Sequence, residues 1–491
     1  MFITEQKEIE QTDTLSQNQT EPVQEQPDIT NVEEEPKVME HQKLLNTLLT
    51  EVKPINFQER ANLSDGEKLT KNHYLIISVE EILSLAQKND WGMCMNNGEI
   101  YVYNSCYWSP LPKPQLEDFL GKAAERLGVD WSEARFHTFR KDLVKQFFST
   151  GFIQRPVKYG DEVLINLKNG TFLITPERQV LLPFDRNDFM TYQLPFCYYG
   201  ASQCPLFHKY LDRVLPDKEL QKILAEYIGY VFIKKNTLKL EKAMILYGSG
   251  ANGKSVFFEV VFALLGKDNV SNFSLQSLTN ATGYQRAKLD DKLLNYASEI
   301  SANMESTIFK QLISGEPIEA RLPYKEPFIL SDYAKFIFNT NGLPKDVEQN
   351  EAFFRRFLII PFLETIPEEE RDSELPNKII TTELPGVFNW VLEGLRRLVH
   401  NKNFTPSDVV ANAVKEYREQ SDTVILFLME EGYEPDIVNE VPLKVMYDQY
   451  KVFCKESGYV AVSLRVYAER LRAKHFTTTR KRNGTVVYAK K

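Results

Sequence analysis

Hydrophobic and polar positions in the first half of the chain alternate between helical and strand-like spacing. The segment YLIISVEEILSLA, which starts at Tyr74, combines an apolar run with helical spacing, and apolar residues recur at helical intervals from Leu116 to Phe148. Residues 91–107 are rich in aromatic residues and are typical of a strand and a turn. The pattern VLINLKNGTFLI at residues 163–174 indicates two strands joined at Asn-Gly. We therefore predict an α+β domain over residues 71–235.

The second half of the chain contains short apolar runs of strand type with helix patterns between them. These runs begin at Ala243, Leu293, Ala334 and Phe357. We predict an α/β domain over residues 236–400, followed by a helical connector over residues 401–436.

Two helix patterns and one hairpin pattern end the chain. The helix patterns cover residues 443–456 and 464–474, and TTTRKRNGTVVY indicates a hairpin that turns at Asn483-Gly484. This order predicts a winged-helix domain over residues 437–491.

The first seventy residues contrast with these patterned regions because they are rich in Gln, Glu and Thr and poor in aromatic residues. Residues 1–40 hold eleven acidic and two basic residues, a balance of −9 that equals the formal charge of the whole chain. Such a segment lacks the apolar surface needed for a core. We therefore predict a disordered acidic tail over residues 1–70.

The opposite end is basic, because residues 461–491 hold nine Arg and Lys against one Glu. If the predicted winged helix binds DNA, its second helix would enter a groove and its wing would contact phosphates. The candidates are Arg465, Arg470 and Arg472 on the helix and Arg480, Lys481 and Arg482 on the wing. A solvated basic surface or a protein-interaction module is the alternative, and the charge favours DNA.

Cysteine usage and hydropathy indicate a soluble protein of a reducing compartment. The five cysteines are scattered over 491 residues without a paired CxxC motif, which is typical of neither a disulfide framework nor a zinc site. No apolar run approaches the length of about eighteen residues that spans a membrane, and no signal region is evident at the N-terminus. We expect a cytoplasmic protein, in a bacterium or an infected host cell, without a membrane partner.

The most specific motif is GSGANGKS, between the apolar run AMILY and the helix pattern VFFEVVFALLG. It fits the phosphate-loop pattern G-x-x-x-x-G-K-[ST] in a strand–loop–helix setting. Glycines let the backbone N–H groups face phosphates, and the positive end of the following helix adds attraction. We expect Lys254 to neutralise the β- and γ-phosphates of ATP and the Ser255 hydroxyl to ligate Mg²⁺. The expected nucleotide-binding residues are Gly248, Ser249, Gly250, Ala251, Asn252, Gly253, Lys254 and Ser255.

Polar residues follow or precede the later strand patterns in the order that a phosphate-loop ATPase requires. Glu299 could orient the attacking water and contribute to the Mg²⁺ site, and Asn341 could sense the γ-phosphate. Arg355 or Arg356 could reach the nucleotide of a neighbouring subunit. Taken singly, these residues fit a solvated strand end, a turn residue and a surface ion pair. In this order behind a phosphate loop, we favour the catalytic interpretation.

The segments GSGANGKS, ASE, GEPIEARLPYKEPF, FNTNGLP and FFRRFLIIPF together resemble the superfamily-three helicases. The resemblance is to the phage- and plasmid-type primase–helicases related to the poxvirus primase–helicase. It is strong over residues 242–362 and looser upstream and downstream. It implies an α/β AAA+-like ring motor, usually a hexamer, that pulls DNA through its pore, with a preceding α+β domain.

Residue by residue, the resemblance implies that Lys254 and Ser255 belong to the phosphate loop and Glu299 to the acidic motif. It implies that Asn341 is the sensor and that Arg356, ahead of Arg355, is the arginine supplied to a neighbouring subunit. Many ring ATPases have two acids at the second motif, whereas here Ser298 precedes a single acid. Mg²⁺ would then depend on Ser255 and water, with Glu299 mainly a base.

The resemblance also implies a hairpin at IEARLPYKEPFIL whose tip faces the pore. A lysine there can pair with a phosphate while an aromatic ring packs on sugar or base. Tyr324 and Lys325 are the DNA-contact candidates, with Arg321 and Lys310 in support. Without the resemblance, an ordinary exposed turn is the simpler interpretation.

These features favour an ATP-dependent DNA helicase that translocates on single-stranded or forked DNA in the replication of a phage, plasmid or mobile element. The alternative is an origin-binding initiator ATPase that acts as an assembly switch without processive unwinding. A small-molecule kinase or regulatory phosphate-loop protein needs neither a pore hairpin nor an arginine from a neighbour. No primase-type zinc site or aspartate cluster is evident in the first two hundred residues. We therefore expect a separate primase or polymerase to supply priming.

Overall fold

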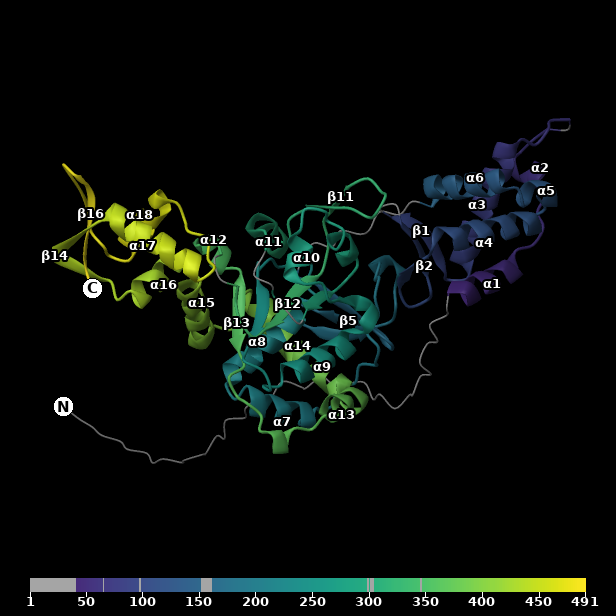
Figure 1. Ribbon diagram of the computed structural model, residues 1–491. Helices are drawn as coiled ribbons and strands as arrows, with labels where there is room; N and C mark the ends of the chain where they lie inside the picture. Colours follow the sequence, from purple (N-terminus) through teal and green to yellow (C-terminus); the bar gives the residue numbers. More distant parts are fainter. Residues whose placement is uncertain are drawn as a thin grey trace, which may run out of the picture. The chain divides into compact units, whose positions relative to one another are not determined.

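The computed structural model describes residues 41–64, 66–96, 99–151, 161–297, 300, 304–344 and 347–491. Buried apolar side chains in this part of the chain form hydrophobic cores, which we use to define three modules. The helices and strands of each module are labelled in Figure 1. We name them the N-terminal module (residues 41–148), the central module (residues 163–420) and the C-terminal module (residues 423–490). Within the described ranges, no helix has both the length and the apolar character needed to cross a membrane.

The N-terminal module is mainly helical and contains one small antiparallel sheet. In its fourth helix, Leu116, Leu120 and Ala123 recur at helical spacing and are buried, and Gly128 ends the helix in the left-handed conformation. Its helices are α1 (His41–Glu51), α2 (Phe57–Arg60), α3 (Lys71–Lys88), α4 (Lys113–Leu127), α5 (Trp131–Ala134) and α6 (His137–Thr150). The sheet contains β1 (Gly92–Asn96), β2 (Glu99–Tyr103) and β3 (Trp108–Pro110).

Helix α1 shows that the prediction of a disordered tail over residues 1–70 is wrong for its second part. Leu44, Leu45 and Leu48 form a short apolar stripe that is buried in the core of the N-terminal module. This short apolar stripe directly follows forty mostly polar residues, so the overall composition of residues 1–70 did not predict a helix there. Residues 1–40 lie outside the described residues, and disorder there stays a prediction.

A five-stranded parallel sheet forms the centre of the central module. Its strands in spatial order are β13 (Phe357–Pro361), β7 (Ala243–Tyr247), β12 (Lys335–Thr340), β9 (Leu294–Ala297) and β8 (Val270–Ser271). All neighbouring strands pair in parallel, so their C-terminal ends lie at one edge. The apolar strands AMILY and FLIIP are almost entirely buried, as expected for a parallel sheet covered on both faces.

Helices and shorter segments surround this sheet. The helices are α9 (Lys254–Leu265), α10 (Leu275–Thr279), α11 (Ser306–Ile313), α12 (Glu351–Phe354), α13 (Leu375–Thr382), α14 (Leu384–Asn401) and α15 (Asp408–Gln420). Strands β10 (Ile318–Ala320) and β11 (Phe328–Leu330) form a separate antiparallel hairpin. Short 3₁₀ turns cover Arg186–Asp188, Lys267–Asn269, Arg286–Leu289 and Glu368–Glu370.

The segment that precedes the parallel sheet shares its hydrophobic core. It contains the antiparallel strands β4 (Val163–Leu167), β5 (Gly170–Ile174) and β6 (Gln179–Leu182), then α7 (Pro205–Val214) and α8 (Lys218–Tyr230). Their buried side chains belong to the same cluster as those of β7, α9 and α14. The predicted domain boundary at residue 235 is therefore wrong, because residues 163–233 pack as part of the central module.

Helices α8 and α14 join the segments before and after the sheet (Figure 1). Glycine permits their close crossing, because a Cβ on Gly394 would lie 2.3 Å from the backbone carbon of Ala225. Beside this crossing, the fully buried Glu226 accepts hydrogen bonds from Arg397 Nε at 3.1 Å and from the Thr405 backbone N–H at 2.8 Å. The central module is thus one packed unit from β4 to α15.

The C-terminal module packs three helices against a three-stranded antiparallel sheet. It contains α16 (Thr423–Glu430), β14 (Glu434–Pro442), α17 (Leu443–Glu456), α18 (Leu464–Ala473), β15 (Thr478–Lys481) and β16 (Gly484–Lys490). The sheet order is β14-β16-β15, and Phe427, Tyr450 and Tyr467 form an aromatic centre for the core.

Two sequence-based boundaries change in this region. The predicted connector 401–436 is divided, because α15 packs in the central core while α16 belongs to the C-terminal core. The predicted turn at Asn483-Gly484 is shifted by one residue. Lys481 pairs with Gly484, so the two turn residues are Arg482 and Asn483.

We predict that Leu48→Ala destabilises the N-terminal module by about 2–5 kcal/mol, because it removes a buried side chain and leaves a cavity. The fluorescence of Trp91, buried in the same core, follows unfolding in urea. Lys43→Ala, an exposed position on the same helix, is the matched control and should leave the midpoint nearly unchanged. Equal midpoints for the two variants would contradict the packed position of α1.

Candidate functional site

The loop between β7 and α9 has a backbone that only small residues adopt easily. Gly250 and Gly253 have φ of 113° and 83°, and Ala251 between them has φ of 49°. Helix α9 begins at Lys254, directly after the bent segment. The loop therefore brings its backbone around the N-terminal end of a twelve-residue helix, whose unpaired N–H groups attract anions.

Lys254 lies over this loop with its side chain largely removed from solvent, at 6% exposure. Its Nζ donates to Gly248 O at 2.7 Å and to the side-chain oxygen of Asn252 at 2.9 Å. Burial lowers the pKa of Lys254. In the described part of the chain no carboxylate forms an ion pair with this ammonium group. The loop thus holds a desolvated cation whose charge is left for an anionic ligand.

Helix α7 supports the loop from behind. The hydroxyl of Tyr210, which is 4% exposed, donates to Gly253 O at 2.8 Å. A Cβ on Gly253 would lie 2.6 Å from Val214 Cγ1, so this residue must be glycine for packing as well as for its φ. The sequence alone did not indicate Tyr210, because it precedes the loop by about forty residues and belongs to no motif.

The position of α7 is itself fixed by a buried carboxylate, Glu383, which directly precedes α14. Glu383 is 5% exposed and accepts hydrogen bonds from the backbone N–H groups of Leu206 and Phe207, both at 2.9 Å. These N–H groups lie in the first turn of α7 and have no partner within the helix. The negative charge of Glu383 also interacts favourably with the positive N-terminal end of the helix dipole.

The segment after β13, residues 362–375, closes the other side of the loop. Phe362 O accepts from Asn252 Nδ2 at 3.0 Å, and the Ile366 N–H donates to Ala251 O at 2.8 Å. Farther along, Glu370 accepts from Arg213 Nε of α7 at 2.9 Å. The loop is therefore enclosed between α7 and this segment.

A cleft of about 810 Å³ opens where these elements meet. Leu206, Val214, Ile366 and Leu375 supply apolar walls, which suit a nucleobase. The loop residues Gly250, Ala251 and Gly253 also line it, and its polar lining residues include Lys209, Arg213, Asn252, Lys254, Ser255, Asn339, Asn341, Glu370, Arg371 and Asp372. The cleft, the buried ammonium and the bent loop together suit an anionic ligand such as a nucleoside triphosphate, and the predicted Ser255 lines the same cleft.

The predicted sensor Asn341 lines this cleft, directly after β12. Asn339, which the sequence did not single out, also lines it and accepts from the buried Tyr296 hydroxyl at 3.0 Å. Asn339 lies within β12 and is held by this hydrogen bond, whereas Asn341 follows the strand. The predicted acid Glu299, with Ser298 before it, lies outside the described residues.

The two candidate arginines differ sharply in exposure. Arg356 is 7% exposed, its Nη2 donates to Ser314 Oγ at 2.7 Å, and it also contacts Glu241 at 3.6 Å. Burial lowers its pKa. Arg355 is exposed and pairs with Glu241 at 3.0 Å. A side chain enclosed in its own subunit is less available to a neighbouring one, so this burial favours Arg355 over the predicted first choice, Arg356.

Both arginines precede β13, which begins beside the start of β7. The phosphate loop follows the opposite end of β7. With about 3.3 Å per strand residue, the five-residue strand separates them by roughly 17 Å. Arg355 therefore cannot serve the loop of its own chain.

Three families match separate parts of the chain. Residues 79–216 match the D5 N terminal like family, residues 246–356 match a family of unknown function, and residues 419–490 match the poxvirus D5 protein-like family. The second match begins within β7 and includes the phosphate loop and both arginines.

Two viral proteins align with this chain at low identity. The candidate helicase L207/L206 of Acanthamoeba polyphaga mimivirus is 25% identical over 194 residues, which are 37% of this chain and 19% of that protein. The candidate helicase 121R of Invertebrate iridescent virus 3 is 24% identical over 281 residues, 50% of this chain and 29% of that protein. The chain thus spans less than a third of either relative's length.

The chain is a relative of the phage and viral primase–helicase family. The resemblance inferred from its motifs is thereby confirmed. Among solved structures, the apo C-terminal region of NrS-1 aligns with a TM-score of 0.46 at 13% identity, over 83% of this chain and 98% of that one. A second apo structure of that region aligns with a TM-score of 0.43.

The hairpin that the sequence predicts at IEARLPYKEPFIL is present in this chain as strands β10 and β11. Ile318 pairs with Leu330 and Ala320 with Phe328, which leaves residues 321–327 as the tip. Tyr324 has φ of 60° and a fully exposed side chain. Lys325 is also exposed, and Arg321 Nε donates to Lys325 O at 3.0 Å.

Several predicted DNA-contact cations are engaged within the chain. Lys310 pairs with Glu348 at 2.8 Å, and Arg470 pairs with the largely buried Asp422 at 2.9 Å, so each would have to give up an ion pair to contact DNA. Arg465 pairs with Glu469 at 3.1 Å, and Lys481 pairs with Glu440. Within the described residues, Arg480, Arg482 and Arg472 form no ion pair, and all three are exposed.

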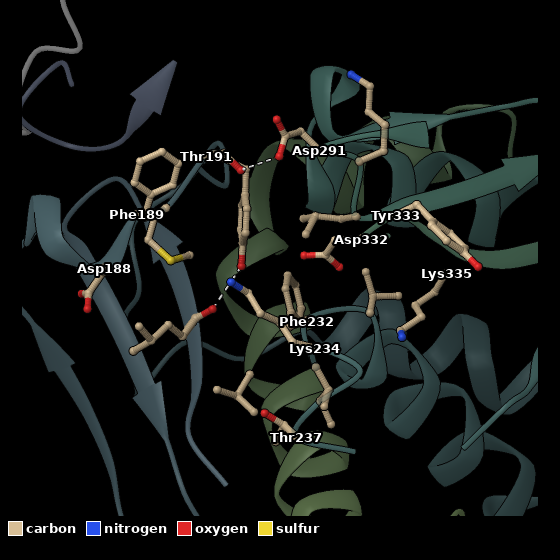
Figure 2. A pocket seen from close by; sticks show the side chains of 18 of the residues that line it. Asp188, Phe189, Thr191, Phe232, Lys234, Thr237, Asp291, Asp332, Tyr333 and Lys335 are labelled. Carbon is tan, nitrogen blue, oxygen red and sulfur yellow. Dashed lines mark hydrogen bonds between the residues drawn. The ribbon is translucent and has the colours of Figure 1, made fainter. Parts of the chain in front are cut away.

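Figure 2 shows a smaller cavity, of about 120 Å³, where β9 and β12 begin. It is lined by both acids and bases, among them Asp291, Asp332, Lys234 and Lys335, and Thr191 Oγ1 donates to Asp291 at 3.4 Å. None of the predicted nucleotide residues lines it. Its mixed charges and its place at the opposite edge of the sheet separate it from the phosphate loop.

We predict that Tyr210→Phe weakens nucleoside triphosphate binding about two- to twelvefold, the effect of one lost hydrogen bond of about 0.5–1.5 kcal/mol. The ring stays in place, so the melting temperature should change little. Titration with a fluorescent nucleotide measures the affinity. Tyr198→Phe is the control, because the Tyr198 hydroxyl makes no hydrogen bond within the described residues. Unchanged affinity in Tyr210→Phe would contradict the supporting role of α7.

Proposed function

We propose that this chain is an ATP-dependent DNA helicase that translocates on single-stranded DNA during replication of a phage, virus, plasmid or mobile element. The observation that carries this proposal is the bent loop Gly248–Ser255 with the buried Lys254 ammonium lying over it. The helicase names of the two viral relatives and the match to the poxvirus D5 protein-like family support the step from nucleotide site to unwinding.

The strand order supports an AAA+-like motor for the central module. Strand β7 lies between β13 and β12, so the chain leaves β7 toward one edge of the sheet and later returns on its other side. Ligands of open parallel sheets bind beyond the C-terminal strand ends at such a reversal. The loop after β7 occupies that position.

ATP and Mg²⁺ are the proposed ligands of this site. Lys254 and the loop N–H groups would hold the phosphates, Ser255 would ligate Mg²⁺, and Asn341 would contact the γ-phosphate. When bound, Mg²⁺ supplies charge neutralisation for the phosphoryl group that is transferred to water. Glu299 remains the proposed base that orients this water.

A ring of identical subunits is the proposed assembly, because the separation of Arg355 from its own loop requires a neighbouring copy. In this assembly Arg355 would leave Glu241 and reach the nucleotide of the next subunit. Its exposure and its weak surface ion pair permit this exchange.

DNA would be contacted by two surfaces that the sequence indicated. At the tip of the β10–β11 hairpin, Tyr324 and Lys325 are exposed, as a pore-facing contact requires. The three helices and three strands of the C-terminal module support its proposed role as a winged helix, in which Arg480 and Arg482 on the hairpin would contact phosphates.

We expect the wild type to hydrolyse ATP and to displace a strand from forked DNA, and Lys254→Ala to lose both activities by at least a hundredfold, or about 2.7 kcal/mol or more. Steady-state hydrolysis and a fluorescent strand-displacement assay measure them. Lys267→Ala, an exposed lysine just after the same helix, is the control and should retain both. Hydrolysis without any strand displacement by the wild type would instead favour an initiator ATPase that acts as an assembly switch.

The trans role of Arg355 predicts complementation between two inactive variants. Arg355→Ala and Lys254→Ala should each hydrolyse little ATP alone, because one lacks the arginine and the other the loop lysine. Mixed in equal amounts, they should regain activity at interfaces that combine an intact loop with an intact Arg355. Arg356→Ala should mainly lower the melting temperature, since its side chain is buried against Ser314. No gain on mixing would overturn the assignment of Arg355.

A further inference from the structure

The N-terminal module exposes two large aromatic side chains close together in sequence. Trp131, the first residue of the short helix α5, is 62% exposed, and Phe136, directly before α6, is 56% exposed. The chain has four tryptophans, and the other three, Trp91, Trp108 and Trp390, are buried or half-buried. Exposed large aromatic side chains this near in sequence are candidates for a binding surface, because aromatic residues often supply the binding energy of interfaces.

Hydrogen bonds order the segment of residues 130–135 that lies between and before these rings. Asp130 caps α5 by accepting from the Ser132 N–H at 2.9 Å. Arg135 donates through Nε and Nη2 to both carboxylate oxygens of Glu125 on α4, at 3.0 and 2.6 Å. Its guanidinium carbon also lies 5.8 Å from the centre of the Trp131 ring. The aromatic surface is therefore held in place before any ligand arrives, which lowers the entropy cost of binding.

A row of basic side chains continues from the aromatic pair. His137 begins α6 directly after Phe136, their rings 4.8 Å apart, and Lys141 and Lys145 follow at four-residue spacing. All three are exposed, and this spacing places them on one face of the helix. Lys141 makes no ion pair within the described residues, and Lys145 pairs only with Asp142 at 3.2 Å.

The acids near this row mostly take part in ion pairs or in helix capping. Asp142 also accepts from Lys71 at 2.7 Å, and Glu125 is occupied by Arg135. Asp130 is used as the cap of α5, which leaves Glu133 as the half-buried carboxylate of this surface. We name Trp131, Phe136, His137, Lys141 and Lys145 the aromatic–basic surface.

We propose that the aromatic–basic surface binds single-stranded DNA, with bases stacked on Trp131 and Phe136 and phosphates beside the row from His137 to Lys145. Aromatic stacking combined with backbone charge is how proteins bind single strands without sequence preference. Duplex DNA offers the rings no free base face except at its ends, so the surface should prefer single strands. The proposal rests on the proposed function only in taking DNA as the partner, because the surface belongs to a module without the phosphate loop.

The test uses the fluorescence of Trp131 in the full chain, without nucleotide. An oligothymidylate of about 16 nucleotides should quench the emission on binding, because bases stack on the exposed indole. Trp131→Phe should abolish most of the quenching while anisotropy shows an affinity within about twofold of the wild type. Trp131→Ala combined with Phe136→Ala should weaken binding at least about tenfold. Tyr199→Ala, which removes a ring of 53% exposure from the central module, is the matched control.

Salt dependence tests the basic half of the surface separately. Lys141→Ala should reduce the slope of log affinity against log salt by about one, as expected for one lost phosphate contact. All measurements are repeated in the Lys254→Ala background, so loss of ATP hydrolysis cannot be confused with loss of this surface. The proposal is overturned if the double aromatic variant binds the oligonucleotide like the wild type, an outcome that would assign the exposed rings to a protein partner. It is equally overturned if blunt duplex quenches Trp131 as strongly as the single strand.

Discussion

The central module depends on one desolvated ammonium group. Lys254 is removed from water, yet it is held by two neutral oxygens, Gly248 O and the side-chain oxygen of Asn252, rather than by a carboxylate. Burial of an unpaired cation is costly, and burial accordingly lowers its pKa. Only an anion in the adjacent cleft would restore full charge compensation. The bent loop, the helix N-terminus behind it and the parallel strand before it all serve to keep this ammonium in place.

The support for that loop comes from segments far apart in the sequence. Tyr210 precedes the loop, and Glu383, which fixes the helix of Tyr210, follows the last strand of the sheet. Neither residue lies in the region 246–356 that matches the family of unknown function. The proposed nucleotide site therefore depends on the whole central module, in which the close crossing of α8 and α14 at Gly394 packs the segments before and after the sheet together.

Local patterns predicted the elements well, because they are set by neighbouring residues. The loop Gly248–Ser255 and the helices that became α9, α17 and α18 could all be predicted from spacing and composition. The misses have non-local causes. The burial of Arg356 involves Ser314, some forty residues away, whose hydroxyl oxygen accepts from the guanidinium group, and no local pattern could indicate this contact. Leu44, Leu45 and Leu48 form too short a stripe to outweigh the polar sequence before them, and only the rest of the core reveals their burial.

Net charge over a sequence window is a poor guide to where this chain could hold DNA. Residues 461–491 carry nine basic side chains, but several of their partners lie outside that window. Asp422, Glu431, Glu434 and Glu440 neutralise Arg470, Lys491, Lys490 and Lys481. The N-terminal module has no comparable excess of charge, yet α5 and α6 combine exposed rings with cations that are unpaired or only weakly paired. For a single strand, whose bases present open faces, exposed rings contribute binding energy that salt does not screen. Exposure and pairing of each side chain, rather than the sum of charges, therefore decide which surfaces are available to DNA.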